Sequence, residues 1–165
     1  MALTILIRGQ LNSIPVLSDD AYTKQNFGEN AGGNTTLSVN TPRGVLGGSV
    51  AGISPGLDYT VVPCTDALRP VGLFVNDAAG AAFENSPAVA SGKVAVMKAQ
   101  ASVEVDVYET NESGGAALVY AVSDLLYCSP QGLLTNEPSG EGTVIGVLTK
   151  APSTASPTIG LDERI

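Results

Sequence analysis

The segment LLYCSPQGLLT, residues 125–135, contains a thiol at Cys128 that is followed directly by Ser129 and Pro130. A cysteine nucleophile reacts as its thiolate, and a nearby histidine usually acts as the base that generates it. The 165-residue sequence contains no histidine. We therefore predict that Cys128 ends a β-strand and that residues 129–132 begin a loop, rather than forming a catalytic turn.

Cys64 and Cys128 are the two cysteines of the sequence, and they allow one disulfide. Such a bond forms readily only when the two Cα atoms lie within about 7 Å of each other, a distance that the sequence does not reveal. The N-terminal MALTILIRGQ lacks the basic and long apolar segments of a signal peptide. Without an export signal, we expect two reduced and partly buried thiols.

The segment ETNESG, residues 109–114, resembles part of a calcium-binding loop. Glu109, Asn111 and Ser113 alternate before a glycine, as oxygen ligands do in such loops. The bidentate glutamate expected at the twelfth position is replaced by Tyr120. An acidic turn is the preferred interpretation, and we expect no bound metal.

Carboxylate pairs for acid–base catalysis are a second possibility, because two such groups need only meet in space. Glu104 and Asp106 share one face of a predicted strand, but an exposed polar face is the commoner cause of such alternation. Zinc chemistry lacks its usual ligands, since there is no histidine and no closely spaced cysteine pair. We expect a protein without enzymatic activity and without a cofactor.

The overall composition also limits the function. The formal net charge of −8 and a pI near 4.3 argue against nucleic-acid binding, which requires clustered Lys and Arg. No stretch approaches the roughly 18 apolar residues of a membrane-spanning helix. A chain of this length fits one domain with its own core.

Short apolar runs separated by Gly and Pro predict an all-β fold, a compact antiparallel sandwich or barrel. Residues 1–20 are predicted as an N-terminal strand or arm, 21–150 as the β-rich body and 151–165 as an extended C-terminal tail outside the core. The Gly-rich segment 44–56 is predicted as a loop packed closely against other backbone. The predicted strands lie in segments 3–9, 35–40, 57–64, 69–77, 93–110, 116–129 and 143–150.

The clearest alternation lies within residues 93–110, which we predict to form two strands or one bent strand interrupted at 99–102. Its second half places Val103, Val105 and Val107 on one face. The opposite face, with Glu104, Asp106 and Tyr108, is expected to meet water or a partner.

Four segments of the chain also carry a resemblance to a known family. They are DALRPVGLFVNDAAGAAFENSPAVASGKVAV, VEVDVYET, DLLYCSPQGLLT and GTVIGVLTKAPSTASPTIGLDER, in this order. These segments resemble the small β-rich virion proteins of tailed bacteriophages, particularly the head decoration or capsid cement proteins. The resemblance covers roughly the C-terminal two-thirds of the chain and includes no catalytic motif.

The resemblance implies a structural virion protein that binds the major capsid protein on the capsid exterior and stabilises the capsid against internal pressure. It also implies self-association, as a homotrimer at threefold positions, and assembly in the bacterial host cytoplasm. An acidic protein suits an exterior position, away from the packaged DNA. Two alternatives stay open: another virion component, associated with the tail or a fibre, and a carbohydrate-binding β-sandwich.

Both chain ends are predicted to contribute to an interface, because unpaired strands and extended termini can pair with a neighbouring subunit. An equally weighted alternative is that both ends fold back onto their own sheet. The candidate interface residues are Leu3, Ile5, Ile7, Arg8, Arg69, Ile159, Leu161 and Ile165.

Overall fold

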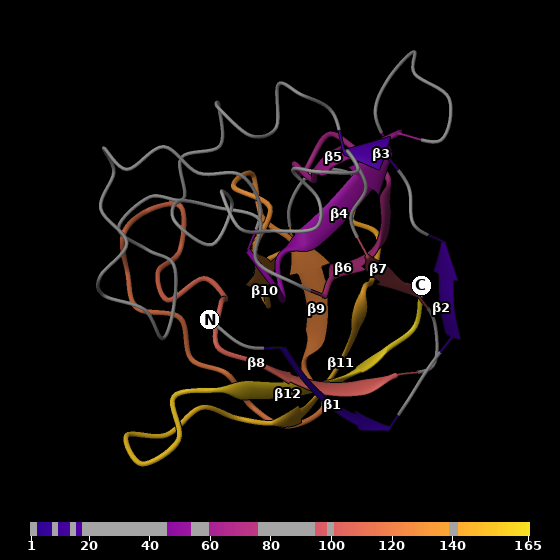
Figure 1. Cartoon of the computed structure of the whole chain (residues 1–165). Helices are drawn as coiled ribbons and strands as arrows, with labels where there is room; N and C mark the ends of the chain where they lie inside the picture. The colour runs from indigo at the N-terminus through magenta and orange to yellow at the C-terminus, as the bar shows by residue number, and fades with distance from the viewer. Residues whose placement is uncertain are drawn as a thin grey trace.

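The computed structural model describes residues 3–7, 10–13, 16–17, 46–53, 60–75, 95–98, 101–138 and 142–165. In these residues the chain is all-β, which confirms the predicted fold class (Figure 1). The described strands are β1 (Leu3–Ile7), β2 (Gln10–Ser13), β3 (Val16–Leu17), β4 (Val50–Ile53), β5 (Thr60–Pro63), β6 (Pro70–Phe74), β7 (Val96–Lys98), β8 (Ser102–Val105), β9 (Leu125–Cys128), β10 (Leu134–Thr135), β11 (Gly146–Lys150) and β12 (Ile159–Glu163).

These strands form two sheets. The first has the order β1-β8-β12-β11-β9-β10, and the second has the order β2-β7-β6-β4-β5-β3. The pairing is antiparallel except between β3 and β5, which run parallel. Buried side chains of both sheets belong to one hydrophobic core, as expected for packed layers. Its members include Val50, Leu73 and Met97 from the second sheet and Val103, Leu126, Leu148, Ile159 and Leu161 from the first.

The alternation predicted in residues 93–110 corresponds to two strands, β7 and β8, which lie in different sheets. Val103 and Val105 are fully buried, whereas Ser102 and Glu104 lie on the outer face of β8. The prediction that Tyr108 lies on the same outer face as Glu104 was wrong, because β8 ends at Val105 and the chain bends at Asp106. Tyr108 is therefore buried, and its ring packs edge-on against Tyr120 with centroids 5.5 Å apart.

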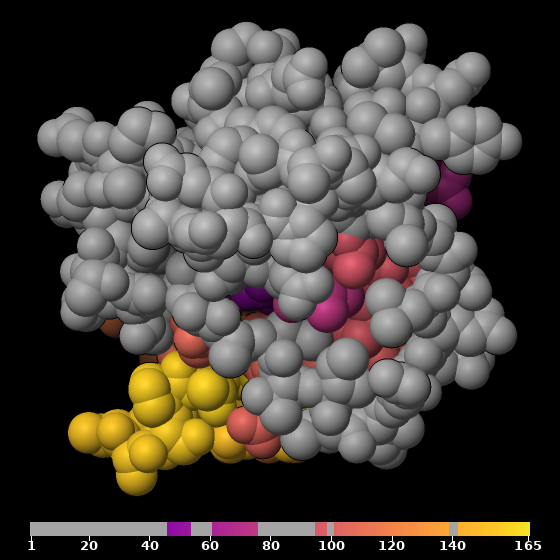
Figure 2. Space-filling model, in the orientation of Figure 1, coloured from indigo at the N-terminus to yellow at the C-terminus, as the bar shows by residue number. Residues whose placement is uncertain are grey.

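The prediction that residues 151–165 form an extended tail outside the core was also wrong. Residues 151–158 form the connection of a hairpin, and β12 follows as an interior strand between β8 and β11. Ile159 and Leu161 are fully buried in the core. The reason is the period-2 pattern of IGLDE, which places both apolar side chains on one face of a strand. Within residues 151–165, the 151–158 connection projects from the body, at the lower left of Figures 1 and 2.

At the N-terminal end, β1 pairs antiparallel with β8, with Leu3 opposite Val105 and Ile5 opposite Val103. The next strand, β2, pairs with β7 in the second sheet. The described strands of segment 1–20 thus fold back onto the chain's own sheets. Two alternatives were predicted for the chain ends: pairing with a neighbouring subunit, or folding back onto the chain's own sheet. In this structure the described strands at both ends follow the second alternative.

The glycine-rich segment 44–56 contains β4, so the prediction of a loop was wrong for residues 50–53. The predicted close packing against backbone does occur there, because a Cβ added to Gly52 would lie 3.2 Å from the Cys64 Cα. Glycine at this position lets β4 approach the neighbouring chain closely. The predicted strand at 35–40 lies outside the described residues.

Candidate interaction surface

Cys128 occupies the last position of β9, as predicted, and a tight turn follows it. The Ser129 Oγ accepts hydrogen bonds from the backbone N–H groups of Gln131 (3.2 Å) and Leu133 (3.1 Å). The Gly132 N–H donates to the Ser129 carbonyl at 3.0 Å, and Gly132 adopts a positive φ of 80°. Glycine adopts this conformation at little cost, so its presence helps to close the turn.

The surroundings of Cys128 disfavour the thiolate. The neighbouring Cys64 thiol and burial both raise the pKa of Cys128, and the nearby charges of Asp66 and Glu109 raise it further. Activated cysteines instead have a lowered pKa and electropositive neighbours. The arrangement around Cys128 therefore favours a protonated, packed thiol.

A polar hollow of about 350 Å³ lies beside this turn, and it includes the three residues of the calcium-like segment. Its lining includes Glu109, Asn111, Ser113, Ser129 and Glu137. The Ser113 backbone N–H and hydroxyl donate to the two carboxylate oxygens of Glu137, at 3.1 and 3.2 Å. Within the described residues, no group of three or more His, Cys, Asp or Glu side chains is arranged to hold a metal ion.

Glu109 lies at the wall of this hollow and is 5% exposed. Burial raises its pKa, a hydrogen bond with Ser129 opposes that effect, and the charge of Glu137 adds to it. The backbone of Glu109 is fixed independently, because its carbonyl accepts a 2.7 Å hydrogen bond from the Tyr120 hydroxyl. The hollow is thus part of a hydrogen-bonded acidic turn.

Replacing Tyr120 with phenylalanine is expected to destabilise the protein by about 1–2 kcal/mol, because the buried Glu109 carbonyl loses its hydroxyl donor. Chemical denaturation of the wild-type and variant proteins measures this difference. Tyr127→Phe is the control, since Tyr127 is only partly buried. Equal losses in the two variants would contradict the specific role of the Tyr120 hydroxyl.

Three large apolar side chains within seven residues face solvent. Val119 is 82% exposed, Val122 is 60% exposed and Leu125, at the start of β9, is 43% exposed. We call these residues the apolar cluster. The three lie in one short segment, and Asn136 links the Val119 carbonyl to the Asp124 side chain within it. Exposed apolar side chains that are grouped in this way make the segment a candidate binding surface.

The backbone that carries the apolar cluster is firmly held. Asn136 donates from its Nδ2 to the Val119 carbonyl and to the Asp124 carboxylate, both at 2.9 Å. The Asp124 carboxylate also accepts from the Ala121 N–H at 2.8 Å. Ser123 has a positive φ of 82°, unusual for a residue with a side chain, and its N–H donates to the Leu148 carbonyl. The cluster is therefore presented in a defined conformation.

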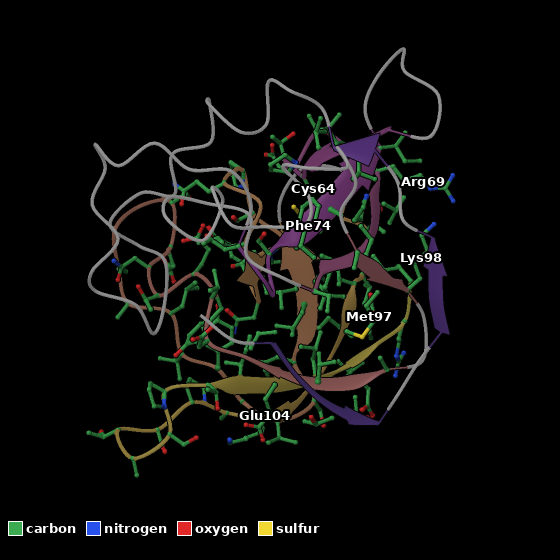
Figure 3. The ribbon with its side chains drawn as sticks, viewed as in Figure 1. Cys64, Arg69, Phe74, Met97, Lys98 and Glu104 are labelled. Carbon is green, nitrogen blue, oxygen red and sulfur yellow. The ribbon has the colours of Figure 1, made fainter. Side chains whose placement is uncertain are left out.

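The outer face of the first sheet is apolar at one end and charged at the other. Leu125 on β9 lies opposite Val147 on β11, which makes this end apolar. On the other side, the Lys150 Nζ lies 2.8 Å from the Glu104 carboxylate of β8. Glu104 lies low in the body, on this outer face (Figure 3). Lys150 also donates to the hydroxyls of Ser156 and Thr158, both at 3.0 Å, and so ties the projecting 151–158 connection to the sheet.

The structure separates the candidate interface residues predicted from the sequence. Leu3, Ile5 and Ile7 lie in β1, at an edge of the first sheet, and Arg8 lies outside the described residues. Arg69 is exposed and extends away from the body (Figure 3).

Among the C-terminal candidate interface residues, the prediction was wrong for Ile159 and Leu161. Ile159 and Leu161 are fully buried, and Ile165 is partly buried against the core. The side chains of Ile159 and Leu161 pack inside the chain's own core, so a partner does not reach them in this fold.

The apolar cluster was not predicted from the sequence, because residues 116–129 were assigned to strands without a prediction of which side chains are exposed. A usable signal was present, since apolar residues occupy consecutive positions from Leu118 to Val122. In an extended segment, consecutive residues point to opposite faces, so they cannot all face one core. Tyr120 is buried, and its neighbour Val119 is exposed.

Comparisons with protein-family models, with curated proteins and with solved structures found no match for this chain. In the part of the chain that the structure describes, no helix has the length and apolar character needed to cross a membrane.

Proposed function

We propose that the protein is a structural virion component that binds the exterior of a tailed-phage capsid and stabilises it against internal pressure. In this proposal it acts as a homotrimer at threefold positions of the major capsid lattice. The observation that carries the proposal is the exposed apolar cluster of Val119, Val122 and Leu125 on an all-β body. The resemblance of four sequence segments to capsid decoration proteins supports the same function.

The apolar cluster suits docking for energetic reasons. Complete burial of an exposed valine or leucine side chain contributes roughly 1.5–3 kcal/mol, so these partly exposed residues supply a modest energy per site. The hydrogen bonds from Asn136 and to Asp124 hold the cluster in advance, which lowers the entropy lost on binding. A trimer would engage three such surfaces together, and avidity would then make weak single contacts effective.

The charge of the protein agrees with an exterior position. The formal net charge of −8 disfavours contact with packaged DNA, because such contact requires neutralisation of phosphates. A protein that binds only the assembled lattice stabilises it by mass action, and the effect is repeated at every site.

A co-sedimentation experiment with mature capsids that lack this protein tests the proposal. The wild-type protein is expected to pellet with capsids and to saturate. The double variant Val119→Asp/Val122→Asp is expected to bind about tenfold more weakly or worse, because a loss of 1.4 kcal/mol already corresponds to a factor of ten.

Ile53→Asp is the matched control. Ile53 is also a large exposed apolar residue, at 46%, but it lies on β4 of the second sheet. This variant should bind within about twofold of wild type if the apolar cluster is the docking surface. Equal binding by the wild-type protein and the double variant would remove the cluster from the proposal. No capsid binding by the wild type would reject the function itself.

Light scattering over a range of protein concentrations tests the trimer separately, against the chain mass of 16.7 kDa. A stable trimer supports docking at a threefold site, since closed rotational symmetry matches that of the lattice. If the protein is a monomer in solution and still binds capsids, the trimer forms only on the capsid lattice. Assembly with tail proteins but not with capsids would favour the alternative virion location.

A further inference from the structure

Cys64 and Cys128 lie where the two sheets approach each other. Cys64 directly follows β5 of the second sheet, and Cys128 ends β9 of the first. Both are free cysteines and both are buried. Both belong to the same hydrophobic core cluster, and the Cys64 thiol is close enough to Cys128 to raise its pKa. Figure 3 shows Cys64 inside the fold, beside β4.

Backbone hydrogen bonds hold this junction in place. The Cys64 N–H donates to the Val50 carbonyl at 2.8 Å, and the Val50 N–H donates to the Gly132 carbonyl at 2.8 Å. Gly132 belongs to the tight turn that begins directly after Cys128. This series of bonds runs from Cys64 through β4 to the turn after β9. The fold therefore holds the two segments that carry the thiols next to each other.

We propose that Cys64 and Cys128 form a dithiol site that closes to an inter-sheet disulfide by exchange with a small-molecule disulfide such as oxidised glutathione. One cysteine thiolate attacks a sulfur of the small disulfide, forms a mixed disulfide and releases one small thiol. The second cysteine thiolate attacks the protein sulfur of that bond and releases the other small thiol. The two cysteine protons pass to the departing thiolates, so two cysteines are oxidised and one small disulfide is reduced.

The intact fold protects this site from rapid exchange. Each thiol is directed to a backbone carbonyl, Cys64 to that of Thr65 (3.3 Å) and Cys128 to that of Ser129 (3.3 Å). Burial excludes a bulky reagent, and the raised pKa of Cys128 keeps its reactive thiolate scarce. Exchange therefore proceeds during folding or when the junction opens, and refolding then favours the internal bond over a mixed disulfide.

The test refolds the full-length chain from urea with excess oxidised glutathione, beside a sample refolded with a reducing agent. After refolding, the oxidised sample is expected to have lost both alkylatable thiols and the mass of two hydrogen atoms. Proteolysis without reduction should yield one cross-linked peptide pair that contains Cys64 and Cys128. The melting temperature should exceed that of the reduced sample by roughly 5–10 °C, because the bond closes a long loop.

Cys64→Ala and Cys128→Ala are the matched controls, since each leaves one thiol, which can form a glutathione adduct or a disulfide between two chains but no internal disulfide. If either variant fails to fold, the cross-linked peptide from the wild-type chain still decides the question. A sample kept in urea with oxidised glutathione should contain mainly mixed disulfides, because the fold is then absent. Mixed disulfides as the main product of the refolded wild type, or an internal disulfide that lowers the melting temperature, would overturn the proposal.

Discussion

Glu163→Gln is expected to stabilise the protein by on the order of 3–5 kcal/mol above about pH 7, and to leave its stability nearly unchanged in acid. Glu163 is 2% exposed at the end of β12. Neither of its carboxylate oxygens has a hydrogen-bond partner among the described residues. Burial without a partner disfavours the charged form and raises the pKa of Glu163 to about 8.

The direction of the pH effect follows from proton binding. Between the ordinary pKa of 4.5 and about 8, the folded state holds a proton on Glu163 that the unfolded state has released. The stabilising contribution of the protonated Glu163 is therefore complete below the ordinary pKa. The free energy of unfolding then falls as the pH rises through this range. Glutamine resembles the neutral carboxylic acid in size and polarity, so the variant avoids the cost of ionisation.

Urea unfolding of both proteins at several pH values, from about 4 to 9, measures the effect. The two curves should coincide in acid and separate progressively as the pH rises. Glu109 also has a raised pKa and Glu104 a lowered one, but both are present in both proteins and cancel in the difference. Glu112→Gln, on an exposed turn, is the control. A constant difference across the pH range would contradict the role of Glu163.

Leu161→Ala is expected to destabilise the protein by about 2–5 kcal/mol, because it removes a buried side chain from an interior strand and leaves a cavity. Leu161 is fully buried, and β12 pairs with β8 on one side and with β11 on the other. The melting temperature and the urea midpoint should both fall. A tail outside the core would predict almost no change.

Leu125→Ala provides the matched control for this prediction. It makes the same chemical change on a neighbouring part of the same sheet, but Leu125 is 43% exposed. Its cost should stay near 1 kcal/mol or below, since surface substitutions leave no cavity. Similar losses for both variants would contradict the interior position of β12.

Regular alternation was the part of the sequence that predicted structure reliably. Val103 and Val105 identified β8, and the Ser-Pro sequence after Cys128 identified the end of β9. The error at the C-terminus had a compositional cause, because the Pro and Ser residues of the 151–158 connection obscured the short pattern of Ile159 and Leu161. Local composition does not indicate whether a short apolar strand finds a place between two others.

The candidate interface could be predicted only in part for a similar reason. Exposure depends on which face of a segment the fold covers, and that is decided by pairing between distant strands. Val119 and Tyr120 are adjacent and both apolar in character, yet one faces solvent and the other the core. That Cys64 and Cys128 lie in the same core cluster likewise depends on how the two sheets meet.

The position of β8 has a consequence for how the chain folds. Val105 pairs with Leu3 on one side and with Ile159 on the other, so one residue joins segments that are far apart in the sequence. Bringing such distant segments together costs loop-closure entropy before the contacts compensate for it, and proteins rich in these contacts fold slowly. During synthesis, the first sheet cannot be completed until β12 has left the ribosome. Until then β8 lacks one of its two neighbours, and its open edge is available for pairing with other chains.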